Sequence, residues 1–463
     1  MSRTHHWLPG PMLAIALSAC GGGAAPASSP VISSAAPSSA PVASSAAASK
    51  PAVSASAKPA GSAAAGGPIK VGVLEPLTGT FSNIAKDNQD GLNLYIDALN
   101  STIAGRKVQL IYADTEGKAD VGLNKAKQLV ESDKVSVLMG ITATPVALAV
   151  AGYVKDAHVP LMITGNGGAQ GLTSDPKVKS PYTTRWTQNA TLILDPAGDW
   201  AYKHGWRKAA IVASDYGAGL ENSAAFASTF VRRGGSIVQE LYPALGAADF
   251  GPYLAQVNQS ADFIFAFFPG VDGLRFMQQF GNYGAHKLPI LDSFGAMTTG
   301  SNLPELKDKA VGVTAETVWS SAVDTPENQA FLRAWNAKYS GRYASTDSAM
   351  GYSAGQILEA ALKKVNGNAE DAQGFLKALY EVDINTAKGH MKLDADHDIV
   401  ENVYVYELVA QGDRIGHKLL DTYKDVSKSW TRSPQELEHF PFGTLKGKLV
   451  GLTKDQVEQL AKA

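Results

Sequence analysis

The sequence predicts an α/β protein built from two similar lobes with parallel sheets. Short, continuous apolar runs alternate with helical patterns of about 10–15 residues, which is typical of βαβ units. The alternation stops at residues 170–188, where Pro, Ser, Asp and Lys cluster, and then starts again. Residues 21–67 show no such pattern, because they are almost wholly Ala, Ser, Pro and Gly. We therefore expect a leader, an unstructured tract and a two-lobed body.

The first twenty residues are predicted to be an export signal. Arg3 gives a basic start, and the apolar run Met12–Ala19 is too short to span a bilayer, which needs about twenty residues. Leu17-Ser18-Ala19-Cys20 resembles a bacterial lipobox. Cys20, the only cysteine in the chain, would then be lipidated, and its acyl chains would hold the protein at a membrane. The alternative is an ordinary signal peptide with an incidental cysteine.

Residues 21–67 are predicted to be a disordered tether. Their only charges are Lys50 and Lys58, and they contain no aromatic residue. Such a tract buries too little apolar surface to offset the entropy lost on ordering. A flexible coil of this length spans roughly 40 Å. The folded body would therefore sample the space just off the membrane.

The first run of alternation begins at Pro68. We expect strands at Ile69–Leu74, Lys107–Ala113, Val135–Met139 and Val159–Thr164, and helices at Ala85–Leu99, Ala119–Ser132 and Pro145–Asp156.

The second run begins near residue 190. We expect strands at Ala209–Ala213, Ile237–Tyr242, Phe263–Phe268, Pro289–Asp292 and Val403–Val409, and helices at Ala190–His204, Leu220–Arg233, Pro252–Gln259, Gly273–Tyr283, 326–340 and 347–365.

Composition excludes several classes of protein. The 41 basic and 43 acidic side chains leave a net charge of −2, so no broad field attracts nucleic acid and we expect no nucleic-acid partner. A single cysteine excludes an internal disulfide framework and a thiolate zinc cluster. We predict no metal and no cofactor.

Three motifs that suggest chemistry lack the context they need. Gly351–Gly355 matches G-x-S-x-G, but no apolar strand precedes Ser353, so packing on a helix face explains these small residues better. Asp394, Asp396 and Asp398 alternate as in a calcium loop but lack its glycine and glutamate, so we predict a solvated turn. Gly165–Gly171 follows a strand but opens no helix, which argues against a dinucleotide site.

The loops after the predicted strands indicate a ligand cleft, because ligands of open α/β sheets bind beyond the carboxyl ends of the strands. In the first lobe these loops carry hydroxyls and glycines. Thr144 suits a helix N-cap and Pro145 the first helical position, so this turn is a candidate anion site. In the second lobe the corresponding loops carry aromatic residues, including Tyr216 and Phe268.

Val71–Gly79, Gly140–Pro145, Val159–Thr164 and Ser214–Gly217 together make the chain resemble a type I periplasmic binding protein. It is similar to the leucine/isoleucine/valine-binding group of ABC transporter substrate-binding lipoproteins, over about residues 68–430. The resemblance implies two Rossmann-like lobes joined by a hinge of three crossovers near residues 187, 312 and 386. It also implies a partner permease and ATPase in the membrane.

The resemblance also implies a ligand site. The predicted ligand-binding residues, including neighbouring aromatic side chains, are Phe81, Thr142, Ala143, Thr144, Gly165, Asn166, Gly168, Trp186, Tyr216, Phe268, Asp292 and Phe294. Family members that bind amino acids hold the ammonium group with acidic residues on two loops. In this sequence 185–189 carries no acid, and 291–295 offers only Asp292. An unpaired ammonium group in a dry cleft would cost several kcal/mol. We therefore expect a small carboxylate or amide-like solute, aromatic solutes included, in preference to an amino acid.

The predicted organisation assigns 68–186 and 313–385 to an N-terminal lobe and 187–312 and 386–430 to a C-terminal lobe. Residues 431–463 form an extension, for which a packed or frayed tail is the default. The predicted function is extracytoplasmic solute capture for an ABC importer, by a monomer that closes about its hinge and catalyses no reaction. Two alternatives stay open. One is a ligand sensor that feeds a signalling receptor, and the other is a secreted hydrolase that uses Ser353.

Overall fold

The structure is a computed structural model that describes residues 66–283 and 287–462. The predicted signal peptide, the lipidation site Cys20 and all but the last two residues of the predicted tether lie outside these residues. They stay predictions. No helix within the described ranges is long and apolar enough to cross a membrane.

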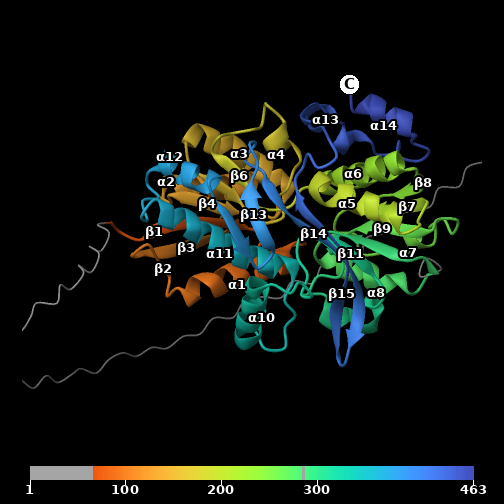
Figure 1. Ribbon diagram of the computed structural model, residues 1–463, viewed down its shortest axis with the longest axis horizontal. Helices are drawn as coiled ribbons and strands as arrows, with labels where there is room; N and C mark the ends of the chain where they lie inside the picture. The colour runs from red at the N-terminus through yellow and green to blue at the C-terminus, as the bar shows by residue number, and fades with distance from the viewer. Residues whose placement is uncertain (1–65, 284–286, 463) are drawn as a thin grey trace, which may run out of the picture. The chain divides into compact units, whose positions relative to one another are not determined.

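The first lobe contains a six-stranded sheet (Figure 1). Its strands are β1 (Ile69–Glu75), β2 (Thr102–Ile103), β3 (Arg106–Asp114), β4 (Val137–Gly140), β5 (Leu161–Ile163) and β6 (Thr183–Arg185). They lie in the order β2-β3-β1-β4-β5-β6, all parallel except the short β2. The predicted strands that became β1, β4 and β5 are buried, as expected for a parallel sheet covered on both faces, whereas β3 is largely half-buried.

Seven helices belong with this sheet, three of them from late in the sequence. They are α1 (Ser82–Ala98), α2 (Ala119–Glu131), α3 (Thr144–Ala157), α4 (Gly171–Ser174), α10 (Pro326–Lys338), α11 (Thr346–Lys364) and α12 (Ala372–Tyr380). In Figure 1, α11 and α12 lie among elements of the first lobe although they follow most of the second lobe in sequence.

The contact between α1 and α11 depends on glycine. A Cβ atom at Gly91 would lie 2.0 Å from the carbonyl oxygen of Ser348, and one at Gly351 would lie 1.9 Å from that of Asn88. The two backbones therefore touch directly. Ser353 is buried in the middle of α11 and not on a strand-to-helix turn, so the small residues of the G-x-S-x-G motif pack helices together as predicted.

The second lobe contains a nine-stranded sheet. Its strands are β7 (Lys208–Ala213), β8 (Ser236–Leu241), β9 (Phe263–Phe267), β10 (Ile290–Ser293), β11 (Thr314–Thr317), β12 (Asp383–Thr386), β13 (Gly389–Leu393), β14 (Ile399–Gln411) and β15 (Arg414–Val426). The order is β12-β13-β14-β11-β10-β9-β7-β8, with β15 paired to β14. Strands β7 to β11 are mutually parallel, and β14 runs antiparallel to β11.

Within the described residues, six helices of the second lobe lie between the first crossover and β11. They are α5 (Ala190–Lys203), α6 (Gly217–Arg233), α7 (Gly251–Leu254), α8 (Val271–Phe280), α9 (Leu303–Leu306) and the short 3₁₀ helix η2 (Lys307–Ala310). The protein is thus an α/β chain of two lobes with parallel sheets, in agreement with the predicted fold class.

The second and third crossovers lie at positions that differ from those expected. The predicted boundary at 312 assigned Thr314–Thr317 to the first lobe, but β11 pairs with β10 and β14 of the second sheet. The predicted boundary at 386 likewise cut off β12, which pairs with β13. The segment 314–317 is Thr-Ala-Glu-Thr, so it lacks the apolar run that revealed the other parallel strands. The first crossover follows β6, near the predicted residue 187.

The aspartate-rich turn before β14 binds the protein's own cations. The buried Asp398 accepts from Arg185 Nε at 2.8 Å and from Thr173 Oγ1 at 2.6 Å. Asp396 pairs with Lys179 and, at 3.0 Å, with Lys428. In the ranges that the structure describes, no cluster of three or more metal-ligating side chains exists. This turn, predicted to be solvated, instead connects the second lobe between β13 and β14 to Arg185 at the first crossover.

The extension after β15 is packed and not frayed. It forms α13 (Pro434–His439), the short 3₁₀ helix η3 (Phe442–Thr444) and α14 (Lys454–Leu460), of which η3 and α14 contact α6 (Figure 1). Gly451 N–H donates to Ile237 of the edge strand β8 at 3.3 Å, and the Gly447 and Leu449 N–H groups donate to the Glu240 side chain at 3.0 Å each. The extension therefore covers one edge of the second sheet.

Candidate ligand-binding site

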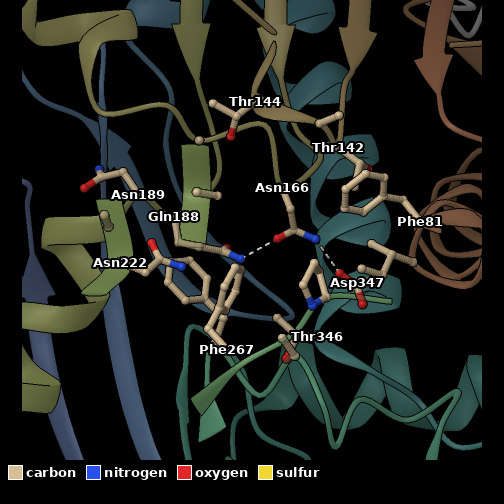
Figure 2. A pocket seen from close by; sticks show the side chains of 18 of the residues that line it. Phe81, Thr142, Thr144, Asn166, Gln188, Asn189, Asn222, Phe267, Thr346 and Asp347 are labelled. Carbon is tan, nitrogen blue, oxygen red and sulfur yellow. Dashed lines mark hydrogen bonds between the residues drawn. The ribbon is translucent and has the colours of Figure 1, made fainter. Parts of the chain in front are cut away.

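A pocket lies beyond the carboxyl ends of the parallel strands, where loops from both lobes face each other. It holds about 770 Å³ of empty space, part of it open to solvent. Figure 2 shows side chains that line it from several separate segments of the chain. The lining residues are Phe81, Ile84, Thr142, Ala143, Thr144, Asn166, Gly168, Gln188, Asn189, Ala190, Tyr216, Ala218, Glu221, Asn222, Phe267, Pro269, Phe294, Gly295, Ala296, Thr299, Thr346 and Asp347.

Five helices begin at this pocket: α1, α3, α5, α6 and α11. The first N–H groups of a helix have no partner within the helix, and its N-terminus carries a partial positive charge. The N-caps of α3 and α6 are Ala143 and Tyr216, and neither side chain caps its helix. The N-cap predicted at Thr144 therefore lies one residue earlier, and the free N–H groups of both helices remain available to a ligand.

One wall of the pocket is aromatic. The rings of Phe81 and Tyr216 have centroids 6.4 Å apart, Tyr216 stacks on Phe267 at 6.3 Å, and Phe267 meets Phe294 edge-on at 5.8 Å. The first of these rings comes from the first lobe and the other three come from the second. A flat apolar ligand would therefore contact both lobes through this wall.

A chain of hydrogen bonds crosses the pocket (Figure 2). Gln188 Nε2 donates to Asn166 Oδ1 at 2.6 Å, and Asn166 Nδ2 donates to Asp347 Oδ1 at 2.7 Å. Thr299 Oγ1 of the second lobe donates to Asp347 Oδ2 at 3.3 Å. Because the Asn166 amide both accepts and donates, its orientation is fixed, and it holds Asp347 in place.

The charged groups of the lining are two acids, Asp347 and Glu221. Among the described residues that line the pocket there is no lysine, arginine or histidine. Burial raises the pKa of Asp347 to about 7, and the negative charge of Asp87 adds to the rise, while hydrogen bonds from Asn166 and Thr299 oppose it. Burial also raises the pKa of Glu221, which accepts from Gln170 N–H at 3.3 Å. Burial thus disfavours the charged form of both acids of the lining.

A third buried acid lies behind the lining. Thr142 Oγ1 donates to Glu75 Oε2 at 2.6 Å, which turns the Thr142 hydroxyl away from the cavity. Burial raises the pKa of Glu75 to about 8, although the bond from Thr142 lowers it. What Thr142 offers a ligand is therefore its backbone more than its hydroxyl.

The lobes also touch at the rim of the pocket. Val271 N–H donates to Thr80 O at 3.2 Å, and Asn83 Nδ2 donates to Asn302 Oδ1 at 3.1 Å. Gly270 has a φ of 60°, and a Cβ atom there would lie 2.1 Å from Thr80 O. This close approach of two backbones requires glycine, and it brings the two lobes into direct contact at the rim.

Eight of the twelve predicted ligand residues line this one pocket. They are Phe81, Thr142, Ala143, Thr144, Asn166, Gly168, Tyr216 and Phe294.

The other four predicted residues lie elsewhere. Trp186 is buried in the core and donates to Thr184 Oγ1 at 3.1 Å. Phe268 packs in the core of the second lobe, whereas Phe267 faces the pocket, because successive side chains of β9 point to opposite faces. Asp292 accepts from Met297 N–H at 3.1 Å and Thr298 N–H at 2.9 Å, so it folds its own loop. Gly165 instead packs against the Ile141 carbonyl group.

The acids of the pocket were missed from the sequence. The expectation that an ammonium group would lack a partner rested on 185–189 and 291–295 alone, whereas the lining carries two acids from other segments. Asp347 comes from the first turn of α11 and Glu221 from the second turn of α6. The one available signal was Ser345-Thr346-Asp347, a typical helix start, although nothing in it points to the cleft.

Comparison with known proteins settles the family. A sequence model of the family described as "Periplasmic binding protein" matches residues 68–413. The chain belongs to this family. The match ends about seventeen residues before the expected limit of residue 430, so the whole of β15 and the extension lie beyond it.

Individual relatives of this periplasmic binding protein agree. "Leu/Ile/Val-binding protein homolog 6" of Brucella melitensis is 28% identical over 76% of this chain and 91% of its own. An ABC transporter substrate-binding protein from Sphaerobacter thermophilus is 33% identical, with a TM-score of 0.73, over 78% of this chain and 99% of its own. A solute-binding protein of an ABC transporter from Rhodopseudomonas palustris BisB5, solved with 3,4-dihydroxybenzoic acid, is 29% identical, with the same TM-score and coverage. The protein is therefore an extracytoplasmic solute-binding protein that is similar in sequence and fold to leucine/isoleucine/valine-binding proteins.

Proposed function

We propose that this periplasmic binding protein captures a small aromatic carboxylate between its lobes and delivers it to an ABC permease. The observation that carries the proposal is the composition of the pocket. Helix N-termini and an aromatic wall surround it, with no cationic side chain among the described lining residues. Backbone N–H groups at helix N-termini bind a carboxylate without a counter-ion.

The two lobes have complementary roles in this proposal. The ligand's carboxylate binds at the start of α3, where the backbone and hydroxyl of Thr144 lie at the pocket. The ring then packs against Phe81 of the first lobe and against Tyr216 and Phe267 of the second. Because the ligand touches both lobes only when they are closed, binding shifts the protein toward the closed form, which the permease recognises.

The ligand of the Rhodopseudomonas palustris relative supports this choice, since 3,4-dihydroxybenzoic acid is an aromatic carboxylate. The second candidate is a branched-chain amino acid. Asp347 and Glu221 favour it, because an ionised carboxyl group in the lining can pair with an α-ammonium group. The name of the Brucella relative points the same way.

Calorimetric titration separates the two candidates. We expect 4-hydroxybenzoate or 3,4-dihydroxybenzoate to bind with a micromolar or lower dissociation constant and leucine to give no heat. Tight binding of leucine together with no response to any aromatic acid would overturn the proposal. Phe267→Ala should weaken an aromatic ligand about tenfold or more, because it removes one ring of the wall.

We also propose that Cys20 is lipidated and that residues 21–67 tether the body to the membrane. The single cysteine at a lipobox-like position supports this. The intact mass of the mature protein tests it. A mature chain that begins at Cys20 and carries acyl groups is expected, and a mature chain without added lipid mass would contradict the proposal.

A further inference from the structure

The two carboxyl groups of the pocket are not needed to hold a carboxylate. Near an anionic ligand an ionised acid is repulsive, and burial without a partner is costly for a carboxyl group. Asp347 and Glu221 nonetheless both reach the lining of this pocket. Their presence therefore requires a part of the ligand other than its carboxylate.

Both groups have unused capacity to accept hydrogen bonds. A carboxylate offers about four acceptor positions. Asp347 uses one for Asn166 at 2.7 Å and one for Thr299 at the long distance of 3.3 Å. Glu221 uses one for Gln170 N–H at 3.3 Å. Each group can still accept from a donor inside the pocket.

The two acids come from different lobes. Asp347 belongs to α11. This helix packs through glycine residues against α1 of the first lobe, so Asp347 is part of that lobe. Glu221 belongs to α6 of the second lobe. Donors on one ligand that satisfy both carboxyl groups would therefore strengthen its contacts with each lobe in the closed form.

A hydroxyl group suits these acids better than an ammonium group. Burial raises the pKa of both carboxyl groups, to about 7 for Asp347. A protonated carboxyl group still accepts a hydrogen bond through its carbonyl oxygen, so a ligand hydroxyl is satisfied in either state. An ammonium group needs the ionised form.

We propose that Asp347 and Glu221 determine specificity by accepting hydrogen bonds from ring hydroxyl groups, so that the protein selects hydroxylated aromatic acids over benzoate. This inference rests on the proposed function. A site built to hydrogen-bond a hydroxyl group rejects the analogue that lacks it, because the buried polar groups then remain unpaired.

The test is a titration of the full chain with benzoate, 4-hydroxybenzoate and 3,4-dihydroxybenzoate. The wild type should prefer at least one hydroxylated acid over benzoate by about tenfold to a hundredfold, the range of a hydrogen bond to a charged group. Asp347→Ala and Glu221→Ala should each reduce that ratio. Asp347→Asn and Glu221→Gln keep one carbonyl acceptor and the side-chain volume, so these variants should keep more of the preference for the hydroxylated acid over benzoate. Asp324→Asn, at an exposed acid outside the pocket, should leave the ratio unchanged.

The ratio distinguishes specificity from a structural role, because a general loss of packing weakens all three ligands together. Equal affinity of the wild type for all three acids, or a ratio that none of the four pocket variants changes, would overturn the inference and leave the proposed function standing. If no aromatic acid binds at all, the proposed function fails and this inference fails with it.

Discussion

Buried carboxyl groups pair with cations at the hinge but not at the pocket. At the hinge Asp398 is fully buried against the guanidinium group of Arg185, and behind the second lobe Asp195 is buried against Arg432. Asp347 in the pocket lining and Glu75 behind it are about as deeply buried, but within the described part of the chain neither pairs with a cation.

The pKa values follow this difference. Burial alone would raise the pKa of Asp398, but the charge of Arg185 and its hydrogen bonds bring that pKa below its usual value. In the pocket burial prevails, and the pKa values of Asp347 and Glu75 rise to about 7 and about 8. The hinge acids have their partners within the protein. Asp347 lines the pocket without a cation and can accept from hydrogen-bond donors there, which agrees with a role in binding a ligand.

The largest effect on stability is expected from breaking the buried Arg185–Asp398 pair at the hinge. Arg185→Met removes the guanidinium group from Asp398 and leaves only the more distant Lys428, at 3.8 Å, as its cation; it also removes the donors to Ala169 O and Thr173 Oγ1. Loss of one member of a buried pair costs about 3–5 kcal/mol. Urea denaturation should show this loss in the free energy of unfolding. Lys179→Met is the control, because the Lys179–Asp396 pair is well exposed and should contribute at most about 1 kcal/mol. Equal losses in the two variants would refute the contrast.

The raised pKa of Glu75, behind the pocket, is tested by the pH dependence of stability. In the folded protein Glu75 titrates near 8, above its ordinary value of 4.5. Between these values the folded state binds more protons than the unfolded state, so this group makes stability fall as the pH rises, by at most about 1.4 kcal/mol per pH unit. Glu75→Gln should remove that slope. At pH 9 the variant should be more stable than the wild type by at least about 1 kcal/mol, and at pH 5 the two should be nearly equal. Parallel stability curves for the two proteins would show that Glu75 ionises normally.

A smaller effect is expected at the rim, where closure brings the two lobes together. Gly270→Ala places a Cβ atom against Thr80 O and should open the rim contact. Ligand affinity should then fall about tenfold, equivalent to about 1.4 kcal/mol, because the closed form becomes less populated. Gly152→Ala on α3 has open space around its Cβ and should leave affinity unchanged. If Gly270→Ala binds ligand as tightly as the wild type, the rim contact does not contribute to closure.

The sequence predicts strands best where they are buried on both faces. The apolar runs of β1 and β9 were placed to within one residue, because a parallel strand between two helical layers has no polar face. β11 was missed since Thr and Glu occupy three of its four positions. β15 was missed because it pairs only with β14 and exposes charged side chains, so no alternation marks it.

The residues of the candidate site also differ in whether the sequence could predict them. Loops that directly follow a strand, such as Thr142–Thr144, were found because strand ends meet at one edge of a sheet. Phe268 was predicted to line the site in place of Phe267, because an error of one residue at a strand end exchanges the two faces of the sheet. Asp347 and Glu221 lie inside helices, and only tertiary packing brings those turns to the pocket. Local patterns do not contain that information.

The glycine contact between α1 and α11 has a consequence for how binding specificity can be transferred between proteins. Asp347 owes its position to a helix pair whose backbones touch, and the two helices are encoded far apart in the gene. Grafting the pocket loops alone onto a relative would leave this acid behind or misplace it. A chimera that is to keep the selectivity must exchange residues 82–98 and 346–364 together.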